Sequence, residues 1–196
     1  MSQSIDALTK ALLHAAKNAG ADSADAMAVR GTSVSVDVRG GALEQAERAE
    51  GVDIGLRVFV GKRSANVSAS DTSTRTIEEM ATRAVAMAKE APEDPYSGLA
   101  DPDQLSTSWD IDALELSDPT PEPSPQTLQD DAARAEAAGL GVKGISQIQS
   151  ASAAYGEQQV YLATSNGFEG GYTRTDRGLS CVAIAGSGTA MERDYD

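Results

Sequence analysis

The chain has 196 residues, of which 40% are hydrophobic and 4% aromatic, so it has room for one ordinary domain or two small ones. It carries 16 Lys and Arg against 30 Asp and Glu, a net charge of 16 − 30 = −14, which argues against direct binding to nucleic acids or anionic membranes because both attract cationic side chains. The chain has one cysteine, no apolar run of 18 residues and an N-terminus that lacks the basic-then-apolar order of a signal peptide. We therefore predict a cytoplasmic protein with no internal disulfide, membrane span or signal peptide.

The first 70 residues predict a helix followed by an antiparallel meander. Apolar residues recur on one face of residues 5–19, with Ser4 placed to cap the helix and Gly20 to end it. Residues 24–60 change to a period of two, and residues 64–70 can form one more strand. Near the end of this meander Val, Ile and Leu alternate with other residues, which we expect on the outer face: Asp53, Gly55, Arg57 and Phe59.

A second helix is predicted over residues 77–90. Thr76 and Glu79 have the spacing of a capping box, and Pro92 stops the helix. A proline-punctuated loop follows. The stretch SDPTPEPSPQ, residues 117–126, then carries four prolines in alternation, which predicts a stiff, extended linker.

A third helix is predicted to start with Ser124 as its cap and Pro125 in its first turn, and to end near Gly139. Strand patterns return after Lys143 in four short stretches. Strands grouped together with helices beside them indicate an α+β fold, with antiparallel sheets and helices packed against them.

The proline-rich linker divides the chain into two segments. We expect an N-terminal α+β domain over residues 1–112, a linker over 113–125 and the start of a second, truncated domain over 126–196. The two segments share a weak echo, since VSVDVRGG…EGVDIGLRVFV resembles VYLATSNG…RGLSCVAIA with one insertion. Internal duplication and convergent hairpin patterning both explain this echo.

The glycine-rich stretch TSNGFEGGYTRTDRGLSC, residues 164–181, has two interpretations. A phosphate-binding loop needs its glycines between a strand and a helix N-terminus. Here another strand pattern follows, so the stretch is typical of a hairpin. Asn166 and Gly167 predict a two-residue turn with positive φ at both positions, and Gly170 and Gly171 predict a bulge or a close backbone approach.

Residue types that carry catalysis are sparse. His14, the only histidine, lies among Leu and Ala residues on the first predicted helix, where a packed or surface role is more common than catalysis. Cys181 alternates with apolar residues on a predicted strand, which is typical of a buried structural thiol. One His and one Cys far apart do not supply a zinc site. We therefore predict no catalytic, cofactor-binding or metal-binding residue in this chain.

Four carboxylates gather in the loop after the second helix: Glu93, Asp94, Asp101 and Asp103. They could hold Ca²⁺, but their spacing is not that of an EF-hand, and the prolines between them favour solvated loop charges. Paired acids for general acid–base chemistry stay open, because 30 carboxylates make such a signal unspecific.

Four stretches occur in order along the chain: GVDIGLRVFVGKRSANVSASD (51–71), EDPYSGLADP (93–102), ATSNGFEGGYTRTDRGLSCVAIA (163–185) and MERDYD (191–196). Together they resemble the TldD/PmbA family, also called TldE or modulator of DNA gyrase, and the PmbA/TldE branch more than TldD. The resemblance covers essentially the whole chain.

This resemblance implies a cytoplasmic protein about twice this length that forms a TldD–TldE heterodimer or a related homodimer. The complex is a zinc metalloprotease that degrades unfolded peptides, processes a microcin precursor and acts on an antitoxin. Zinc is held by a His-Glu-x-x-x-His helix in the TldD partner, and the PmbA/TldE branch generally lacks that helix. The gyrase name comes from genetics and requires no contact with DNA.

From the resemblance we expect a PmbA/TldE-like subunit that lacks the zinc motif and helps to form a peptide chamber. Its expected partners are a TldD-like zinc-bearing subunit, or a second copy of itself, and unfolded peptides. The chain stops before the C-terminal part of the family, as a truncated product, an engineered fragment or a partial gene would. Two alternatives stay open: a scaffold or interaction domain without proteolysis, and a stand-alone enzyme that uses carboxylates or Cys181.

Overall fold

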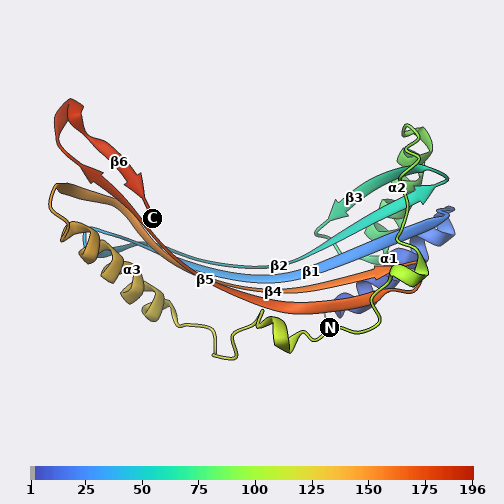
Figure 1. The fold of residues 1–196 in the computed structure, drawn as a ribbon, viewed down its shortest axis with the longest axis horizontal. Helices are drawn as coiled ribbons and strands as arrows, with labels where there is room; N and C mark the ends of the chain where they lie inside the picture. Colours follow the sequence, from blue (N-terminus) through green and yellow to red (C-terminus); the bar gives the residue numbers. More distant parts are fainter. Residues whose placement is uncertain (1–2) are drawn as a thin grey trace. The chain divides into compact units, whose positions relative to one another are not determined.

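A computed structural model describes residues 3–196 and shows three α-helices and one six-stranded sheet (Figure 1). The helices are α1 (Ile5–Ala19), α2 (Thr74–Glu90) and α3 (Pro125–Leu140). The strands are β1 (Ser23–Arg39), β2 (Ala42–Val60), β3 (Arg63–Ala69), β4 (Ile145–Thr164), β5 (Glu169–Ala185) and β6 (Glu192–Tyr195), in the sheet order β3-β2-β1-β4-β5-β6. The predicted α+β class is confirmed.

The chain forms two compact units, and each unit draws on separate stretches of sequence. Unit 1 contains the described residues up to Gly31 together with Gly51–Leu116 and Gln158–Thr173, and unit 2 contains Thr32–Glu50, Ser117–Glu157 and Arg174–Asp196. The long strands β1, β2, β4 and β5 each contribute residues to both units. The domain division at residues 112 and 126 stays a prediction.

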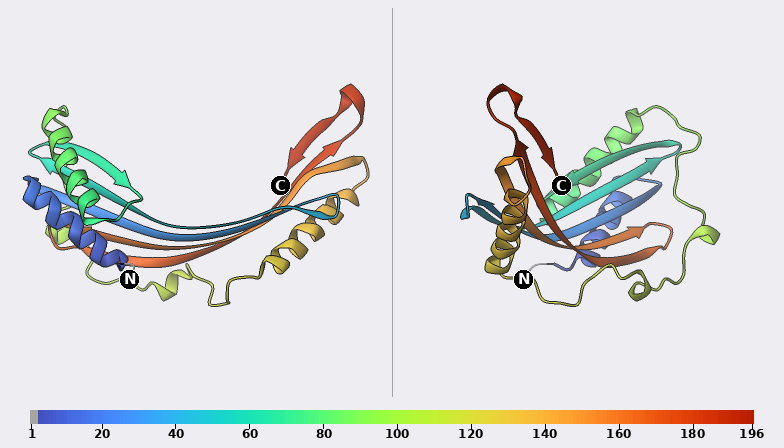
Figure 2. Two further views of the ribbon diagram at one scale, coloured as in Figure 1. Left: turned by 180° about the vertical axis from the view of Figure 1, so that it is seen from behind. Right: turned by 60° about the vertical axis from the view of Figure 1, so that its left-hand side comes forward.

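Unit 1 is built around two helices on one face of its strands. The helices α1 and α2 contact each other, and α2 also contacts β3; they lie side by side against the strands in Figure 2 (left). Half of the buried residues of α2 are alanines: Ala81, Ala84 and Ala88. The core comprises Leu8, Leu12, Ala16, Ala24, Ala26, Ala28, Ile54, Leu56, Val58, Val67, Ile77, Met80, Ala81, Ala84, Val85 and Ala88.

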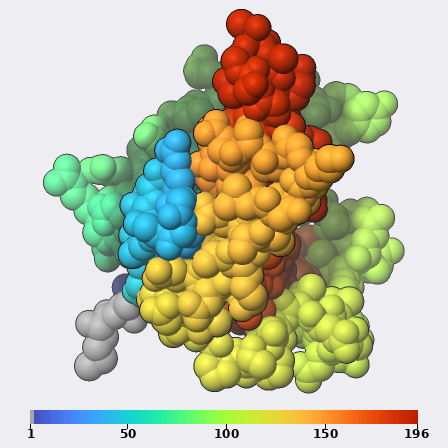
Figure 3. Space-filling view, turned by 90° about the vertical axis from the view of Figure 1, so that its left-hand side faces the viewer, coloured from blue at the N-terminus to red at the C-terminus, as the bar shows by residue number. Residues whose placement is uncertain are grey.

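Unit 2 has a single α-helix, α3, which packs on β1 and β4. Its core comprises Val34, Val36, Val38, Leu128, Ala132 and Ala153. Figure 3 views this unit with α3 in yellow, β4 in orange and the β1–β2 hairpin in light blue. The buried carboxylate of Glu136 on α3 accepts the backbone N–H groups of Gly40 and Gly41 at 2.6 and 2.7 Å, which fixes the tip of that hairpin to the helix.

The helix ends follow local sequence with two corrections. At α1, Gly20 ends the helix with a left-handed φ of 95°, but Ser4 at the N-cap position makes no capping hydrogen bond with its side chain. The helix α2 starts three residues earlier than predicted, because the Ser73 hydroxyl accepts the Thr76 N–H at 3.3 Å. The capping box predicted at Thr76 and Glu79 was therefore wrong. The predicted start of α3, with Ser124 as cap, is confirmed.

The strands are longer than their local patterns indicate. The four short stretches predicted after Lys143 join into two strands, β4 and β5, and β6 was not predicted. Both long strands continue through a glycine, Gly156 in β4 and Gly178 in β5, which the sequence pattern had marked as an end. Phe59, expected on the exposed outer face, is only 2% exposed.

The glycine-rich stretch after β4 is a hairpin, as predicted, with a different turn. The Thr164 N–H donates to the Phe168 carbonyl at 2.9 Å, and Gly167 has a φ of 105°. Among the described residues only Glu115 has a positive φ without being glycine, so the predicted positive φ at Asn166 was wrong. The predicted close approach is confirmed at Gly171, where a Cβ would lie 2.4 Å from the Val160 carbonyl oxygen.

Candidate functional site

The face of the unit 1 strands that points away from α1 and α2 carries the candidate site. Side chains alternate between the two faces of a strand, so the burial of Ile54, Leu56 and Val58 against the helices turns Gly55 and Arg57 to the other face. The same alternation on β1 buries the alanines and turns Asp25 and Met27 outward. We call this surface the open face of unit 1.

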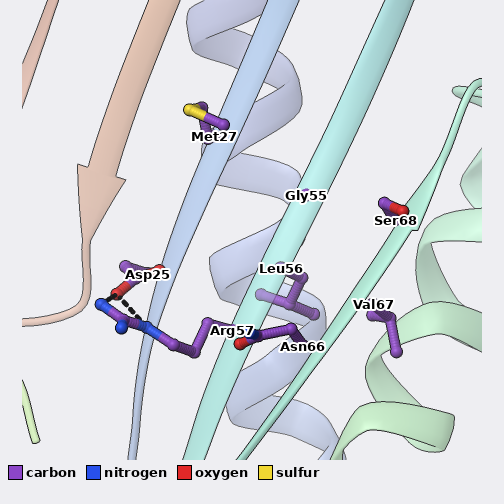
Figure 4. Close-up of a pocket in the computed structure, with 8 residues that line it drawn as sticks. All are labelled: Asp25, Met27, Gly55, Leu56, Arg57, Asn66, Val67 and Ser68. Carbon is purple, nitrogen blue, oxygen red and sulfur yellow. Dashed lines mark hydrogen bonds and ion pairs between the residues drawn. The ribbon is translucent and has the colours of Figure 1, made fainter.

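An ion pair between neighbouring strands lies at the centre of the open face. Both Nε and Nη2 of Arg57 donate to the same carboxylate oxygen of Asp25, Oδ2, with Nε at 2.8 Å (Figure 4). The guanidinium carbon of Arg57 also lies 5.1 Å from the centre of the Phe59 ring, within the range of a cation–π contact. These two contacts hold the guanidinium in a defined orientation.

The Asp25–Arg57 pair borders two shallow hollows. The strand hollow, about 400 Å³, is lined by Asp25, Met27, Gly55, Leu56, Arg57, Asn66, Val67 and Ser68 (Figure 4). The loop hollow, about 360 Å³, lies between the strands and the loop after α2 and is lined by Asp25, Arg57, Gly98, Leu99, Ala100, Gln104, Leu105, Ser106, Leu162, Thr164, Asn166 and Phe168. Both hollows therefore combine apolar walls with one shared charged pair.

The loop after α2, residues 91–116, is held to unit 1 by a few specific contacts. The Asn166 side chain donates to the Ala100 carbonyl at 2.8 Å. The Trp109 ring centre lies 5.6 Å from that of Phe168, and a Cβ on Gly170 would meet the indole at 2.5 Å. The absence of a side chain at Gly170 thus lets Trp109 lie against β5. This contact confirms the close approach predicted at this glycine.

The two residues considered for nucleophilic or metal chemistry lie in different units. His14, in unit 1, is close to the Asn18 side chain at 3.0 Å on the exposed side of α1. Cys181, in unit 2, is half-buried with its Sγ 3.9 Å from the Ala135 carbonyl, and burial raises the pKa of its thiol. A raised pKa keeps the thiol protonated at neutral pH, as a structural cysteine would be.

The loop carboxylates have separate local partners. Glu93 pairs with Arg63 at 3.4 Å, and Asp94 accepts the Tyr96 N–H at 2.9 Å within its own turn. Asp101 and Asp103 belong to the turn around a short 3-10 helix at Pro102–Gln104. These contacts order the loop locally.

A zinc site, which the family resemblance implies for its complexes, does not fit the residues present. Across residues 3–196 no group of three His, Cys, Asp or Glu side chains has an arrangement that could hold a metal ion. Zinc in proteins needs three or four such ligands. No chemical step at zinc can therefore be assigned to the side chains described. Within the same residues, no helix is both long enough and apolar enough to cross a membrane.

The sequence analysis missed Asp25, Arg57 and the open face as a site. Alternation on β2 did place Arg57 opposite the buried residues, but its partner lies 32 residues away on β1. Which residue of β1 stands beside Arg57 depends on the strand register, which local patterns do not give.

Comparisons with known proteins agree on one family. Residues 24–88 match the profile of the PmbA/TldA metallopeptidase domain 1, and residues 118–196 match that of the PmbA/TldA metallopeptidase central domain. Metalloprotease PmbA of Escherichia coli O157:H7 is 32% identical over 89% of this chain and 38% of its own length. The metalloprotease PmbA homolog of Haemophilus influenzae is 27% identical over 92% of this chain and 40% of its own length.

Solved structures share the fold. A Bacteroides thetaiotaomicron protein named as a modulator of DNA gyrase superposes with a TM-score of 0.85 at 22% identity, over 97% of this chain and 43% of its own. TldE of Thermococcus kodakarensis superposes with a TM-score of 0.73 at 14% identity, over 96% of this chain and 42% of its own. The chain thus spans about two fifths of the relatives and structures that it matches.

Proposed function

Because the chain belongs to the PmbA/TldD metallopeptidase family, we propose that it is part of a PmbA/TldE-like subunit that contacts unfolded peptides in a zinc metalloprotease complex. In this proposal the zinc and the bond cleavage belong to a TldD-like partner subunit. The chain described here contributes a wall of the chamber in which the peptide is held. Its expected compartment is the cytoplasm.

The observation that carries the proposal is the open face of unit 1. It combines two hollows, exposed apolar side chains and one oriented ion pair on a surface that neither α1 nor α2 covers. Ligand sites typically combine apolar walls with a few well-placed polar groups. An unfolded peptide, which offers apolar side chains and charged groups, matches this composition.

A scaffold without any link to proteolysis is the main alternative. It would use the same surfaces to join proteins, and it would not need a face that takes unfolded peptides in particular. A stand-alone enzyme based on carboxylates or Cys181 is the second alternative. The loop carboxylates have separate partners, which does not favour an enzyme based on paired carboxylates. The raised pKa of the Cys181 thiol does not favour an enzyme with Cys181 as its nucleophile.

Reconstitution with the TldD-like subunit of the same organism tests the proposal. The two chains are mixed, assembly is followed by gel filtration, and cleavage of a fluorogenic unfolded peptide is measured with and without a chelator. We expect a chelator-sensitive activity that needs both chains and that falls when Met27 and Leu162 on the open face are both changed to Glu. Replacing the exposed Leu140 and Val142 of unit 2 by Glu is the matched control.

Three outcomes would contradict the proposal. Cleavage by the 196-residue chain alone, unaffected by a chelator, would establish the stand-alone enzyme. Assembly with the partner without any cleavage of the unfolded peptide would establish a scaffold. Cleavage that stays unchanged when the open face is altered would show that this face does not hold the peptide.

A further inference from the structure

We propose that Arg57 in the strand hollow is a binding site for a carboxylate attached to an apolar group, with the C-terminal carboxylate of a peptide as its ligand. This inference rests on the proposed function, since it names which end of a peptide the open face receives. It assigns the Asp25–Arg57 pair a role in recognition beyond joining β1 to β2.

Arg57 keeps donors free for a ligand. Its Nε and Nη2 are both used by one oxygen of Asp25, and within residues 3–196 its Nη1 has no protein acceptor. The Arg side chain presents a planar fork of N–H donors that suits carboxylates. Because Asp25 and Phe59 already orient the guanidinium, little side-chain entropy is lost when a ligand binds.

The accessible member of the pair is the cation. The side chain of Arg57 is 47% exposed, whereas that of Asp25 is 15% exposed. Although both residues line the strand hollow, a ligand there has more of the guanidinium than of the carboxylate open to it. This difference in exposure favours an anion over an ammonium group as the ligand.

The surroundings of Arg57 select an apolar neighbour for that anion. Met27 in the strand hollow is 45% exposed, and Leu162 in the loop hollow is 37% exposed. An extended peptide that ends at Arg57 can place its last apolar side chain against one of them. Inorganic anions would gain the charge contact without this apolar contact.

Gly55 leaves the space that the ligand needs. It lines the strand hollow beside Arg57, and a Cβ on it would meet nothing nearer than the Met27 carbonyl oxygen at 4.0 Å. A larger side chain at Gly55 therefore fills the hollow without backbone clash. The glycine costs strand stability and has no packing requirement here, which fits a position kept open for a ligand.

The test uses the whole chain labelled with ¹³C at its methionine methyl groups. Two probes are titrated, acetyl-Ala-Ala-Leu with a free C-terminal carboxylate and the same peptide with a C-terminal amide. We expect the acid to shift the Met27 methyl signal. The amide lacks the charge-assisted contact with Arg57, so we expect its affinity to be at least about tenfold lower than that of the acid. The exposed methyl groups of Met87 and Met191 should not move.

Two variants separate the site from general folding effects. Gly55→Val should keep the fold and abolish the Met27 shift by filling the hollow. Gly178→Val is the matched control, since Gly178 is a strand glycine of unit 2 with open space around a Cβ, and it should bind as the natural chain does. Circular dichroism and thermal melting of both variants check that they fold.

The outcomes distinguish this inference from the proposed function. Equal binding of acid and amide at Met27 would overturn the carboxylate site while leaving a peptide surface in place. No shift of Met27 with either probe would contradict both. Binding that persists in Gly55→Val would place the carboxylate elsewhere and would also overturn the inference.

Discussion

The two units differ in packing, although the chain runs through one order of elements twice and each long strand contributes to both units. A helix, two long strands and a short strand occur in the order α1, β1, β2, β3 and again in the order α3, β4, β5, β6. In unit 1 a second helix, α2, completes a core drawn from two helices and three strands. In unit 2 the core comes from one helix and two strands.

This difference shows in the outer strands. Val67 of β3 is buried, whereas all four residues of β6 are exposed. Leu179 near the middle of β5 is 56% exposed, and the neighbouring apolar residues of β5 are only half-buried. Unit 1, whose strands two α-helices cover, is thus well packed, and unit 2, whose strands one α-helix covers, is partly exposed.

Truncating one buried leucine in each core should have the largest effect and should reveal this contrast. Leu12 and Leu128 are both fully buried, at 0% exposure. We expect Leu12→Ala to cost about 4 kcal/mol of unfolding free energy and Leu128→Ala about 2.5 kcal/mol, because a less enclosed site can collapse around the missing atoms. Urea unfolding of both variants, followed by hydrogen exchange of each unit, gives the comparison. A larger loss at Leu128 would contradict the packing contrast.

The hairpin contact of Glu136 should be the main polar support of unit 2. Glu136→Ala removes two short bonds to the Gly40 and Gly41 N–H groups and should cost about 2 kcal/mol, because hydrogen bonds to charged groups are stronger than neutral ones. Asp130→Ala on the exposed side of α3 is the control and should cost under about 0.5 kcal/mol. Equal losses in the two variants would show that the hairpin tip needs no such anchor.

Some features of both units could be predicted from sequence because they are local. The bounds of α1 follow from its apolar spacing and Gly20, and the start of α3 follows from Ser124 and Pro125. The start of α2 was misjudged because two hydroxyl residues, Ser73 and Thr76, both precede the apolar pattern, and hydrogen-bond geometry decides between them.

Other features depend on contacts between distant residues, which local patterns do not contain. The full lengths of β4 and β5 are set by neighbouring strands, so interior glycines did not end them. Phe59 lies on the strand face opposite the core residues, where the alternation predicts exposure. It is nevertheless buried, and the Arg57 guanidinium lies over its ring. The candidate site depends on the register of β1 against β2, and this is why no site residue was predicted.

Acid should weaken unit 2 through one carboxylate. Hydrogen bonding to Arg177 lowers the pKa of Asp131 in the folded protein, with charge contributions from Arg177 and Arg134. A lowered folded pKa means that this stabilisation is present above the unfolded value of about 3.9 and is lost as pH falls through the folded pKa. We expect a loss of at most about 1 kcal/mol below pH 4, absent in Asp131→Asn. Unfolding curves at pH 3 to 6 measure it, and an unchanged pH profile in the variant would disprove the assignment.

Cutting the proline-rich linker should have the smallest effect on stability. Limited proteolysis is expected to cut first within residues 117–126, most of which are exposed. Because β1 and β4 are neighbours in the sheet, the two fragments should stay associated and elute together in gel filtration. Release of a folded 1–112 fragment would instead support the division into successive domains that the sequence predicts.

Hydrogen exchange in the presence of an unfolded peptide tests the central claim most directly. A neutral 12-residue peptide of alternating Leu and Ser is added to the chain, and deuterium uptake is compared between the units. The account predicts slower exchange in the strands of the open face, around residues 25–27, 55–57 and 160–164, with no change in unit 2. Protection confined to unit 2, or none in either unit at millimolar peptide, would contradict the proposal that unit 1 presents the peptide-binding surface.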